Sequence, residues 1–143
     1  MIIYFGIGSN LGEREENLRN ALRLLDDRVG KQLVCSSVYR SSPLGFVSEN
    51  EFANIVVAYQ TDYSPEEILI ITQNIEKEMG RKQKSINGVY HDRIIDIDLL
   101  QANSNSSLSI IVNTPSLTLP HPRMYERDFV MIPLHEVEQI INN

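Results

Sequence analysis

The segment Ile95-Asp96-Ile97-Asp98-Leu99 alternates apolar and acidic residues. Successive side chains of a β-strand point to opposite faces, so the alternation predicts a strand with three apolar side chains in a core and both carboxylates on the other face. The bases of Asp96 and Asp98 would lie roughly 7 Å apart along that strand. A strand of this kind needs a sheet that is covered on the face of its apolar residues.

The rest of the chain supplies the partners of this strand. Short apolar and β-branched runs predict strands at 2–7, 33–40, 52–61, 93–101 and 109–112. Helical spacing predicts helices at 13–29 and 65–79, with a closing helix at 123–137. The order β-α-β-β-α-β predicts an α+β fold of the ferredoxin-like class, with helices packed on one face of an antiparallel sheet. The other face would be free to carry a site.

The helix at 65–79 has the clearest boundaries. Ser64 is a good N-cap, Pro65 suits the first helical position, and Glu67 completes a Ser-x-x-Glu capping box. Gly80 stands where a glycine commonly ends a helix.

Composition narrows the class of protein. The 143 residues predict one domain, 1–143, and no apolar run approaches the roughly 20 residues of a membrane helix. The net charge of −6 argues against a nucleic-acid binder. Cys35 is the single cysteine and cannot form an internal disulfide, so a cytoplasmic location is expected.

The two aspartates favour a divalent cation. Like charges this close raise the cost of ionising each other, and a bound cation removes that cost. Magnesium prefers one or two carboxylates together with water and phosphate oxygens. The alternative is an exposed strand face that happens to carry two acids, and the spacing alone does not separate the two readings.

Basic residues flank this strand on both sides. Arg81 and Lys84 precede it, Arg93 is its first residue, and a second group, His121, Arg123 and Arg127, follows. Arg123 and Arg127 are four residues apart and would share a helix face. Cations beside magnesium and phosphate are typical of phosphoryl-type transfer. The alternatives are a solvated surface loop and a turn histidine that caps the last helix.

The segment Gly6-Ile7-Gly8-Ser9-Asn10 looks like a phosphate-binding glycine loop, but it lacks the P-loop lysine and the dinucleotide spacing. We interpret its glycines as a tight strand exit with close backbone packing.

Together these pieces resemble the 6-hydroxymethyl-7,8-dihydropterin pyrophosphokinase family of folate biosynthesis. The matching stretches appear in the order of the family and cover most of the chain. They are Gly8-Ser9-Asn10-Leu11, Tyr39-Arg40-Ser41-Ser42-Pro43-Leu44-Gly45, Phe52-Ala53-Asn54, Gln73-Asn74-Ile75-Glu76, Arg93-Ile94-Ile95-Asp96-Ile97-Asp98-Leu99-Leu100 and Leu119-Pro120-His121-Pro122-Arg123-Met124-Tyr125-Glu126-Arg127-Asp128-Phe129.

The resemblance implies a magnesium-dependent transferase that moves pyrophosphate from ATP to the pterin hydroxymethyl group and releases AMP. It implies that Asp96 and Asp98 hold two Mg²⁺ ions, with Arg81 and Arg93 also catalytic. The implied ATP-binding positions are Gln73, Glu76, Arg81, Lys84, Arg93, Leu99, Thr118, His121 and Arg127. The implied pterin-binding positions are Ser41, Pro43, Leu44, Phe52, Asn54 and Phe129. Phe52 and Phe129 could sandwich a flat heterocycle, while Asn54 offers its edge a donor and an acceptor.

The chain departs from the family in the loop before the acidic strand. Relatives commonly read Arg-Trp-Gly-Pro-Arg where this chain reads Val89-Tyr90-His91-Asp92-Arg93. The polar loops 42–51 and 81–92 flank the expected site, and we expect them to close over the substrates and exclude water. The partners expected are small molecules, with neither nucleic acid nor membrane, and the protein is expected to be a monomer.

Two other functions use the same features. A ferredoxin-like regulatory domain could bind a nucleotide without catalysis and would not need the paired aspartates. A magnesium-dependent phosphodiesterase or nuclease could use two strand carboxylates, but it would bind nucleic acid, which the charge of −6 disfavours.

Overall fold

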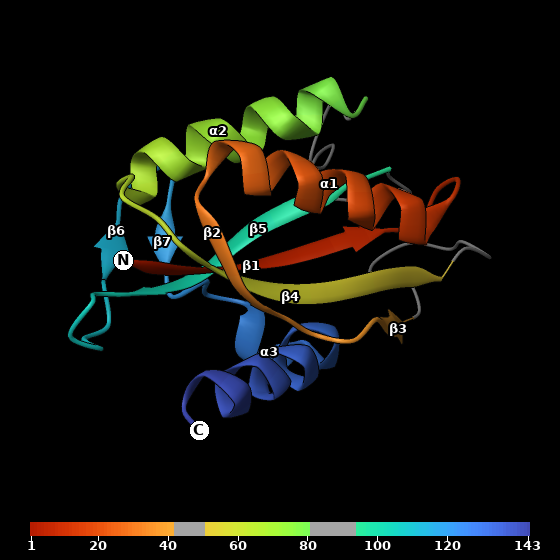
Figure 1. Cartoon of the computed structure of the whole chain (residues 1–143). Coiled ribbons are helices and arrows are strands. Elements are labelled where there is room, and N and C mark those ends of the chain that lie inside the picture. The colour runs from red at the N-terminus through yellow and green to blue at the C-terminus, as the bar shows by residue number, and fades with distance from the viewer. Residues whose placement is uncertain (42–50, 81–93) are drawn as a thin grey trace.

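Figure 1 shows the computed structural model of the chain, which describes residues 1–41, 51–80 and 94–143. The described residues form β-strands, α-helices and one short 3₁₀ turn. In chain order they are β1 (Ile2–Ser9), α1 (Arg14–Arg28), β2 (Lys31–Cys35), β3 (Tyr39–Ser41), β4 (Phe52–Gln60), α2 (Pro65–Glu78), β5 (Asp96–Asn103), β6 (Val112–Asn113), β7 (Thr118–Leu119), the 3₁₀ turn η1 (Met124–Glu126) and α3 (Asp128–Ile141). Among the described residues, no helix is both long and apolar enough to cross a membrane.

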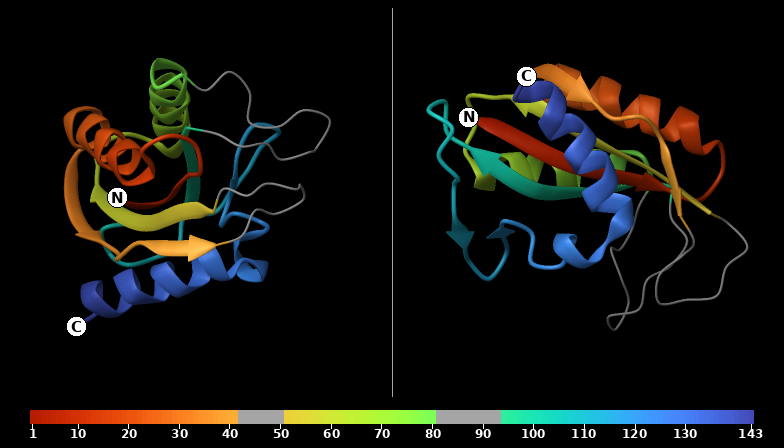
Figure 2. Two further views of the ribbon diagram at one scale, coloured as in Figure 1. Left: turned by 90° about the vertical axis from the view of Figure 1, so that its right-hand side faces the viewer. Right: turned by 90° about the horizontal axis from the view of Figure 1, so that it is seen from below.

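The main sheet is antiparallel and runs in the order β2-β4-β1-β5, with β3 also paired to β4. The central strand β1 is therefore bonded to β4 on one side and to β5 on the other, and β5 forms an edge of the sheet. Helices α1 and α2 lie together on one face (Figure 2). The α+β architecture expected from the order of elements is confirmed.

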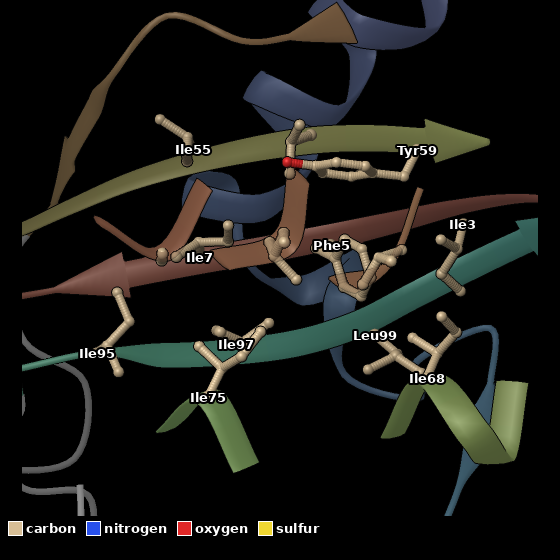
Figure 3. Close-up of a cluster of buried hydrophobic side chains, with 14 of the residues drawn as sticks. Ile3, Phe5, Ile7, Ile55, Tyr59, Ile68, Ile75, Ile95, Ile97 and Leu99 are labelled. Carbon is tan, nitrogen blue, oxygen red and sulfur yellow. The ribbon is translucent and has the colours of Figure 1, made fainter. Parts of the chain in front are cut away.

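The larger core lies between this face and the two helices. Alternate residues of β1, β4 and β5 supply it, including Ile3, Phe5 and Ile7 of β1 (Figure 3). The Tyr59 ring meets Phe5 edge-on, with the ring centroids 5.8 Å apart. Its hydroxyl donates to Asp26 Oδ1 at 2.5 Å, so the buried phenol has a partner on α1. Apolar burial on this face holds the strands in register.

The opposite face is not left free, because α3 packs across part of it (Figure 2). A second apolar cluster joins the sheet to α3 and to η1. Its buried members are Tyr4, Val56, Ala58, Leu100, Met124, Val130, Leu134 and Val137. The expectation of an open second face was therefore wrong for this half of the sheet, because the closing helix is strongly apolar on one side and needs a surface to cover.

Helix α2 begins and ends where the sequence predicts. Ser64 Oγ accepts from the Glu67 N–H at 3.2 Å, and Glu67 Oε1 accepts from the Ser64 N–H at 3.0 Å. These are the two reciprocal bonds of a capping box. Gly80 follows the helix with a φ of +97°, a conformation that disfavours residues with a side chain.

Strand boundaries differ from the prediction in three places. The strand expected at 33–40 is two strands, because Ser36 lies between them and its Oγ accepts from the Val56 N–H at 2.9 Å. The strand expected at 93–101 begins at Asp96 in the described residues. The strand expected at 109–112 is reduced to a bridge at Ser109 and to β6, which pairs with β7 in a separate small sheet.

Candidate active site

The half of the second sheet face that lies beyond the α3 cluster carries three of the predicted site residues, Asn54, Asp96 and Asp98. Gly8 of β1 is paired with Asn54 of β4 and with Asp96 of β5, and Gly6 is paired with Val56 and Asp98. Directly paired residues on antiparallel strands point to the same face. Asn54, Asp96 and Asp98 therefore share one face. Gly6 and Gly8 lie inside β1, which continues to Ser9, so the predicted strand exit at these glycines was wrong.

The two aspartates are arranged as the alternation predicts. Both are half-buried, and Ile97 between them points into the core on the other face with 1% of its surface exposed (Figure 3). In the described parts of the chain, no cluster of three or more His, Cys, Asp or Glu residues could hold a metal ion. Two carboxylates on one face fit magnesium, because that ion commonly keeps water and phosphate oxygens as its remaining ligands.

Glu76 connects α2 to the acidic strand. Its side chain is only 4% exposed, and Oε2 accepts a hydrogen bond from the Ile97 N–H at 2.8 Å. Because β5 is an edge strand, this N–H points away from β1 toward the free edge. Glu76 therefore fixes the backbone between the two aspartates. Gln73, one turn earlier on the same side of the helix, is exposed.

Leu99 is predicted to contact ATP, but its side chain is buried in the core beneath α1 and α2. Any contact with a ligand must therefore use its backbone. Groups two residues apart in a strand face the same edge, so the Leu99 N–H lies on the same free edge as that of Ile97. The sequence alone could not separate a side-chain role from a backbone role at this position.

His121 is anchored beside the same strand. Its backbone N–H donates to the Leu100 carbonyl oxygen at 2.7 Å, and its Nδ1 accepts from the Arg123 N–H at 3.2 Å. Thr118 is exposed on β7, two residues before the turn that leads to His121. The predicted turn histidine is thus held against β5 through its backbone.

Arg123 and Arg127 do not share a helix face, contrary to the prediction. Arg123 precedes η1, whereas Arg127 has extended φ and ψ angles of −118° and 107° between η1 and α3. The break places the Arg127 guanidinium 5.7 Å from the centroid of the Phe129 ring, a cation–π contact. Phe129 is half-buried at the start of α3, beside the second apolar cluster.

Asn54 and Ser41 form the other polar part of the site. Asn54 is 6% exposed, and its Nδ2 donates to Ser41 Oγ at 3.0 Å. Ser41 is the cross-strand partner of Phe52, which is half-buried at the start of β4. The structure thus brings Ser41, Phe52 and Asn54 together. The predicted site residues Pro43, Leu44, Arg81, Lys84 and Arg93 lie outside the described residues, as do most of loops 42–51 and 81–92.

Cys35 is not a nucleophile in this fold. Burial, followed by the nearby Glu136 and Asp26 carboxylates, raises the pKa of its thiol to about 11. The reactive form of cysteine is the thiolate, so this thiol is protonated and inert near neutral pH.

Known proteins similar to the chain agree on one family. Residues 4–139 match the family model described as 7,8-dihydro-6-hydroxymethylpterin-pyrophosphokinase. A 2-amino-4-hydroxy-6-hydroxymethyldihydropteridine pyrophosphokinase of Porphyromonas gingivalis is 50% identical over 136 residues, which is 95% of this chain and 90% of that protein. The protein of the same name from Bacillus subtilis is 39% identical over 139 residues, which is 96% of this chain and 78% of that protein.

Solved structures agree on the fold. The chain superposes with a TM-score of 0.70 and 15% identity on a crystal structure described as HPPK-DHPS in complex with substrates. The match covers 95% of this chain and 40% of that longer one. Because the family model spans nearly the whole chain and the relatives match over most of their length, this chain belongs to the 7,8-dihydro-6-hydroxymethylpterin-pyrophosphokinase family.

Proposed function

We propose that the chain transfers pyrophosphate from ATP to the hydroxymethyl group of 6-hydroxymethyl-7,8-dihydropterin and releases AMP, a step of folate biosynthesis. The names of its relatives support this reaction. The observation that carries it in the structure is the shared face of Asn54, Asp96 and Asp98. An amide suited to a heterocycle edge and an acid pair suited to magnesium then stand on the same open half of the sheet.

The spacing of these groups suits the acceptor. Asn54 and Asp96 are two strands apart, which is roughly 10 Å at the backbone. A bicyclic pterin whose edge meets the Asn54 amide can extend its hydroxymethyl group toward the acid pair. Ser41 holds the amide in place, and the half-buried rings of Phe52 and Phe129 offer apolar surface for the flat heterocycle.

ATP is proposed to lie along the free edge of β5. There the backbone of Leu99 is available to the base of ATP. Thr118 and Gln73, which match ATP-binding positions of the family, are both exposed. Since His121 Nδ1 accepts from the Arg123 N–H, a neutral imidazole carries its proton on Nε2, which can donate to a phosphate oxygen. Arg127 supplies a fixed positive charge at the start of α3.

Asp96 and Asp98 would hold magnesium, and two Mg²⁺ ions are expected. The metal would neutralise the charge of the phosphate oxygens during transfer. The oxygen of the hydroxymethyl group attacks the β-phosphorus while the bond from that phosphorus to the oxygen shared with the α-phosphate breaks, so that AMP leaves. The work of the protein is to position both substrates and to stabilise charge. The proposal also includes five residues that lie outside the described parts of the chain. Arg81, Arg93 and Lys84 are proposed to assist the transfer, and Pro43 and Leu44 are proposed to contact the pterin.

The nucleotide product tests this function. The protein is mixed with ATP, magnesium and 6-hydroxymethyl-7,8-dihydropterin, and the nucleotides are separated by chromatography. AMP that forms only when the pterin is present supports the proposal. Formation of ADP, or release of AMP without the pterin, would contradict it.

A single-domain monomer in the cytoplasm remains the expectation for the protein as a whole.

A further inference from the structure

The two glycines of β1 that face the site are surrounded differently. A methyl group built on Gly8 would stand 2.6 Å from Asn54 Oδ1 and 3.5 Å from Phe52 Cδ1. The three atoms nearest to a methyl group built on Gly6 all belong to the Leu100 side chain, at 3.3 to 3.6 Å. At Gly8 the methyl group would lie closer than about 3 Å to Asn54, which forces that side chain to move, whereas at Gly6 the Leu100 side chain would have to give by only a few tenths of an ångström.

The backbone does not explain the glycine at position 8. Among the described residues, the glycines with positive φ are Gly12, Gly30 and Gly80. Gly8 lies in regular antiparallel pairing with both neighbouring strands, a conformation that any residue can adopt. What position 8 lacks room for is therefore a side chain, and the atom that occupies the room is the amide oxygen of Asn54.

Asn54 has little freedom to give way. Its side chain is buried, and its Nδ2 donates to Ser41 Oγ at 3.0 Å. Turning the amide away from a methyl group on residue 8 would move Nδ2 from Ser41 as well, because oxygen and nitrogen belong to one planar group. The added methyl group would thus change the orientation of the Asn54 amide and leave the fold of the strand intact.

We propose that Gly8 is a positioning residue for the pterin: the absence of a side chain at position 8 fixes the Asn54 amide in the orientation that binds the heterocycle edge. The proposal rests on the proposed function, in which Asn54 recognises the pterin. Gly6 has no such role, because the space above it is filled by Leu100 of the second apolar cluster.

The test compares Gly8→Ala with the matched variant Gly6→Ala by calorimetric titration. Each protein is titrated with a non-hydrolysable ATP analogue and magnesium, and then with the pterin. Gly8→Ala should weaken pterin binding about tenfold, the effect of losing one well-placed hydrogen-bonded pair, and should leave binding of the analogue unchanged. Gly6→Ala should bind the pterin as the wild type does and show a lower thermal midpoint, because its methyl group presses on Leu100.

The Asn54→Ala background isolates the mechanism. Asn54→Ala removes the atom that the new methyl group would meet, so adding Gly8→Ala in this background should change pterin affinity little further. This comparison also serves if Gly8→Ala alone folds poorly, since the double variant relieves the contact. Equal losses with and without Asn54 would overturn the proposal, because they would show that Gly8 acts independently of the amide.

A structural measurement needs no ligand. In spectra of ¹⁵N-labelled protein, Gly8→Ala should shift the side-chain NH₂ signals of Asn54, whereas Gly6→Ala should leave them in place. If the wild type binds the pterin and Gly8→Ala binds it equally tightly, this inference fails and the proposed function stands. If the wild type does not bind the pterin at all, the proposed function fails and takes this inference with it.

Discussion

On the face covered by α1 and α2, the strands β1, β4 and β5 present large apolar side chains along most of their length. On the opposite face, the same strands form a second apolar cluster only where α3 covers them. Beyond that cover they present Gly8, Asn54, Asp96 and Asp98. One alternating sequence therefore builds a continuous core on one side and, on the other, half a core and half a polar surface.

The difference shows how a strand can carry two like charges. At roughly 7 Å their repulsion is on the order of 1–2 kcal/mol for an effective dielectric constant between those of the protein surface and water. Burying one isoleucine contributes about 1.5–3 kcal/mol. Ile95 and Ile97, both fully buried on the core face, are thus sufficient to offset the acid pair without any metal bound. The core face provides the stability that the polar face does not.

The largest expected effect comes from neutralising the acid pair. Asp96→Asn and Asp98→Asn should each lower turnover by about a thousandfold or more, since they remove the charge that is proposed to hold magnesium at the reacting phosphates. The thermal midpoint should stay the same or rise slightly, because a repulsion disappears. Steady-state AMP formation and thermal unfolding measure the two quantities. Asp62→Asn, an exposed aspartate after the far end of β4, is the control and should change neither. Near-normal turnover in Asp96→Asn would contradict the proposed role of this carboxylate, and a regulatory nucleotide-binding domain would instead keep its normal activity in the cell without the aspartate.

Ile97→Ala, between the two aspartates, should show the opposite pattern, with a large loss of stability and a small loss of turnover. Ile97→Ala should lower the free energy of unfolding by about 2–5 kcal/mol, since it leaves a cavity between β5 and the helices. The loss of turnover per folded molecule should be far smaller than in Asp96→Asn. Ile70 of α2 is 59% exposed, so Ile70→Ala should change stability by less than about 0.5 kcal/mol. Urea titration decides. Equal losses of unfolding free energy in Ile97→Ala and Ile70→Ala would show that the core face does not carry the stability.

An intermediate effect is expected at Glu76, which joins the two regions. Glu76→Ala removes the acceptor of the Ile97 N–H and should cost about 1–3 kcal/mol of unfolding free energy, together with part of the turnover. Glu76→Gln keeps an oxygen that can accept the same bond and should recover most of both. The comparison of the two variants by urea titration and kinetics separates the hydrogen bond from the charge. A Gln variant as impaired as the Ala variant would assign the role to the charge.

The smallest effect concerns the attachment of α3. Glu136 accepts from Ser37 Oγ at 2.6 Å and from the Ser37 N–H at 2.7 Å, and these bonds, the side-chain bond first, lower the pKa of its carboxyl. A folded pKa below the unfolded value of about 4.3 means that the stabilisation is present above that value and is lost as the pH falls through the folded pKa. The contribution should stay below about 1 kcal/mol, since the carboxylate is largely exposed to water.

Ser37→Ala should therefore reduce this pH dependence. The difference in thermal midpoint between pH 6 and pH 3 should be slightly smaller in the variant than in the wild type. An identical difference in both proteins would show that the Ser37 hydroxyl does not tune this carboxylate.

The sequence predicted those features that depend on residues close together along the chain. The capping box at Ser64 and the glycine after α2 involve neighbours within a few residues, and the strand parity of Asp96 and Asp98 follows from alternation. What it missed depended on distant partners. The break at Ser36 exists because Val56 supplies the amide, and the placement of Gly8 against Asn54 is visible only once two strands are in register. Arg127 leaves the helix because η1 ends before α3 begins, a boundary with no strong local signal.

The outer edge of β5 has a consequence for the behaviour of the protein in solution. An edge strand with open backbone groups is a template on which other chains can add strands and aggregate. Here Glu76 covers the Ile97 N–H, His121 covers the Leu100 carbonyl, and Ile110 covers the Ala102 carbonyl. Leu99 lies between the first two of these contacts, and a nucleotide bound there would complete the cover. Substrate should then act as a guard against self-association as well as a reactant.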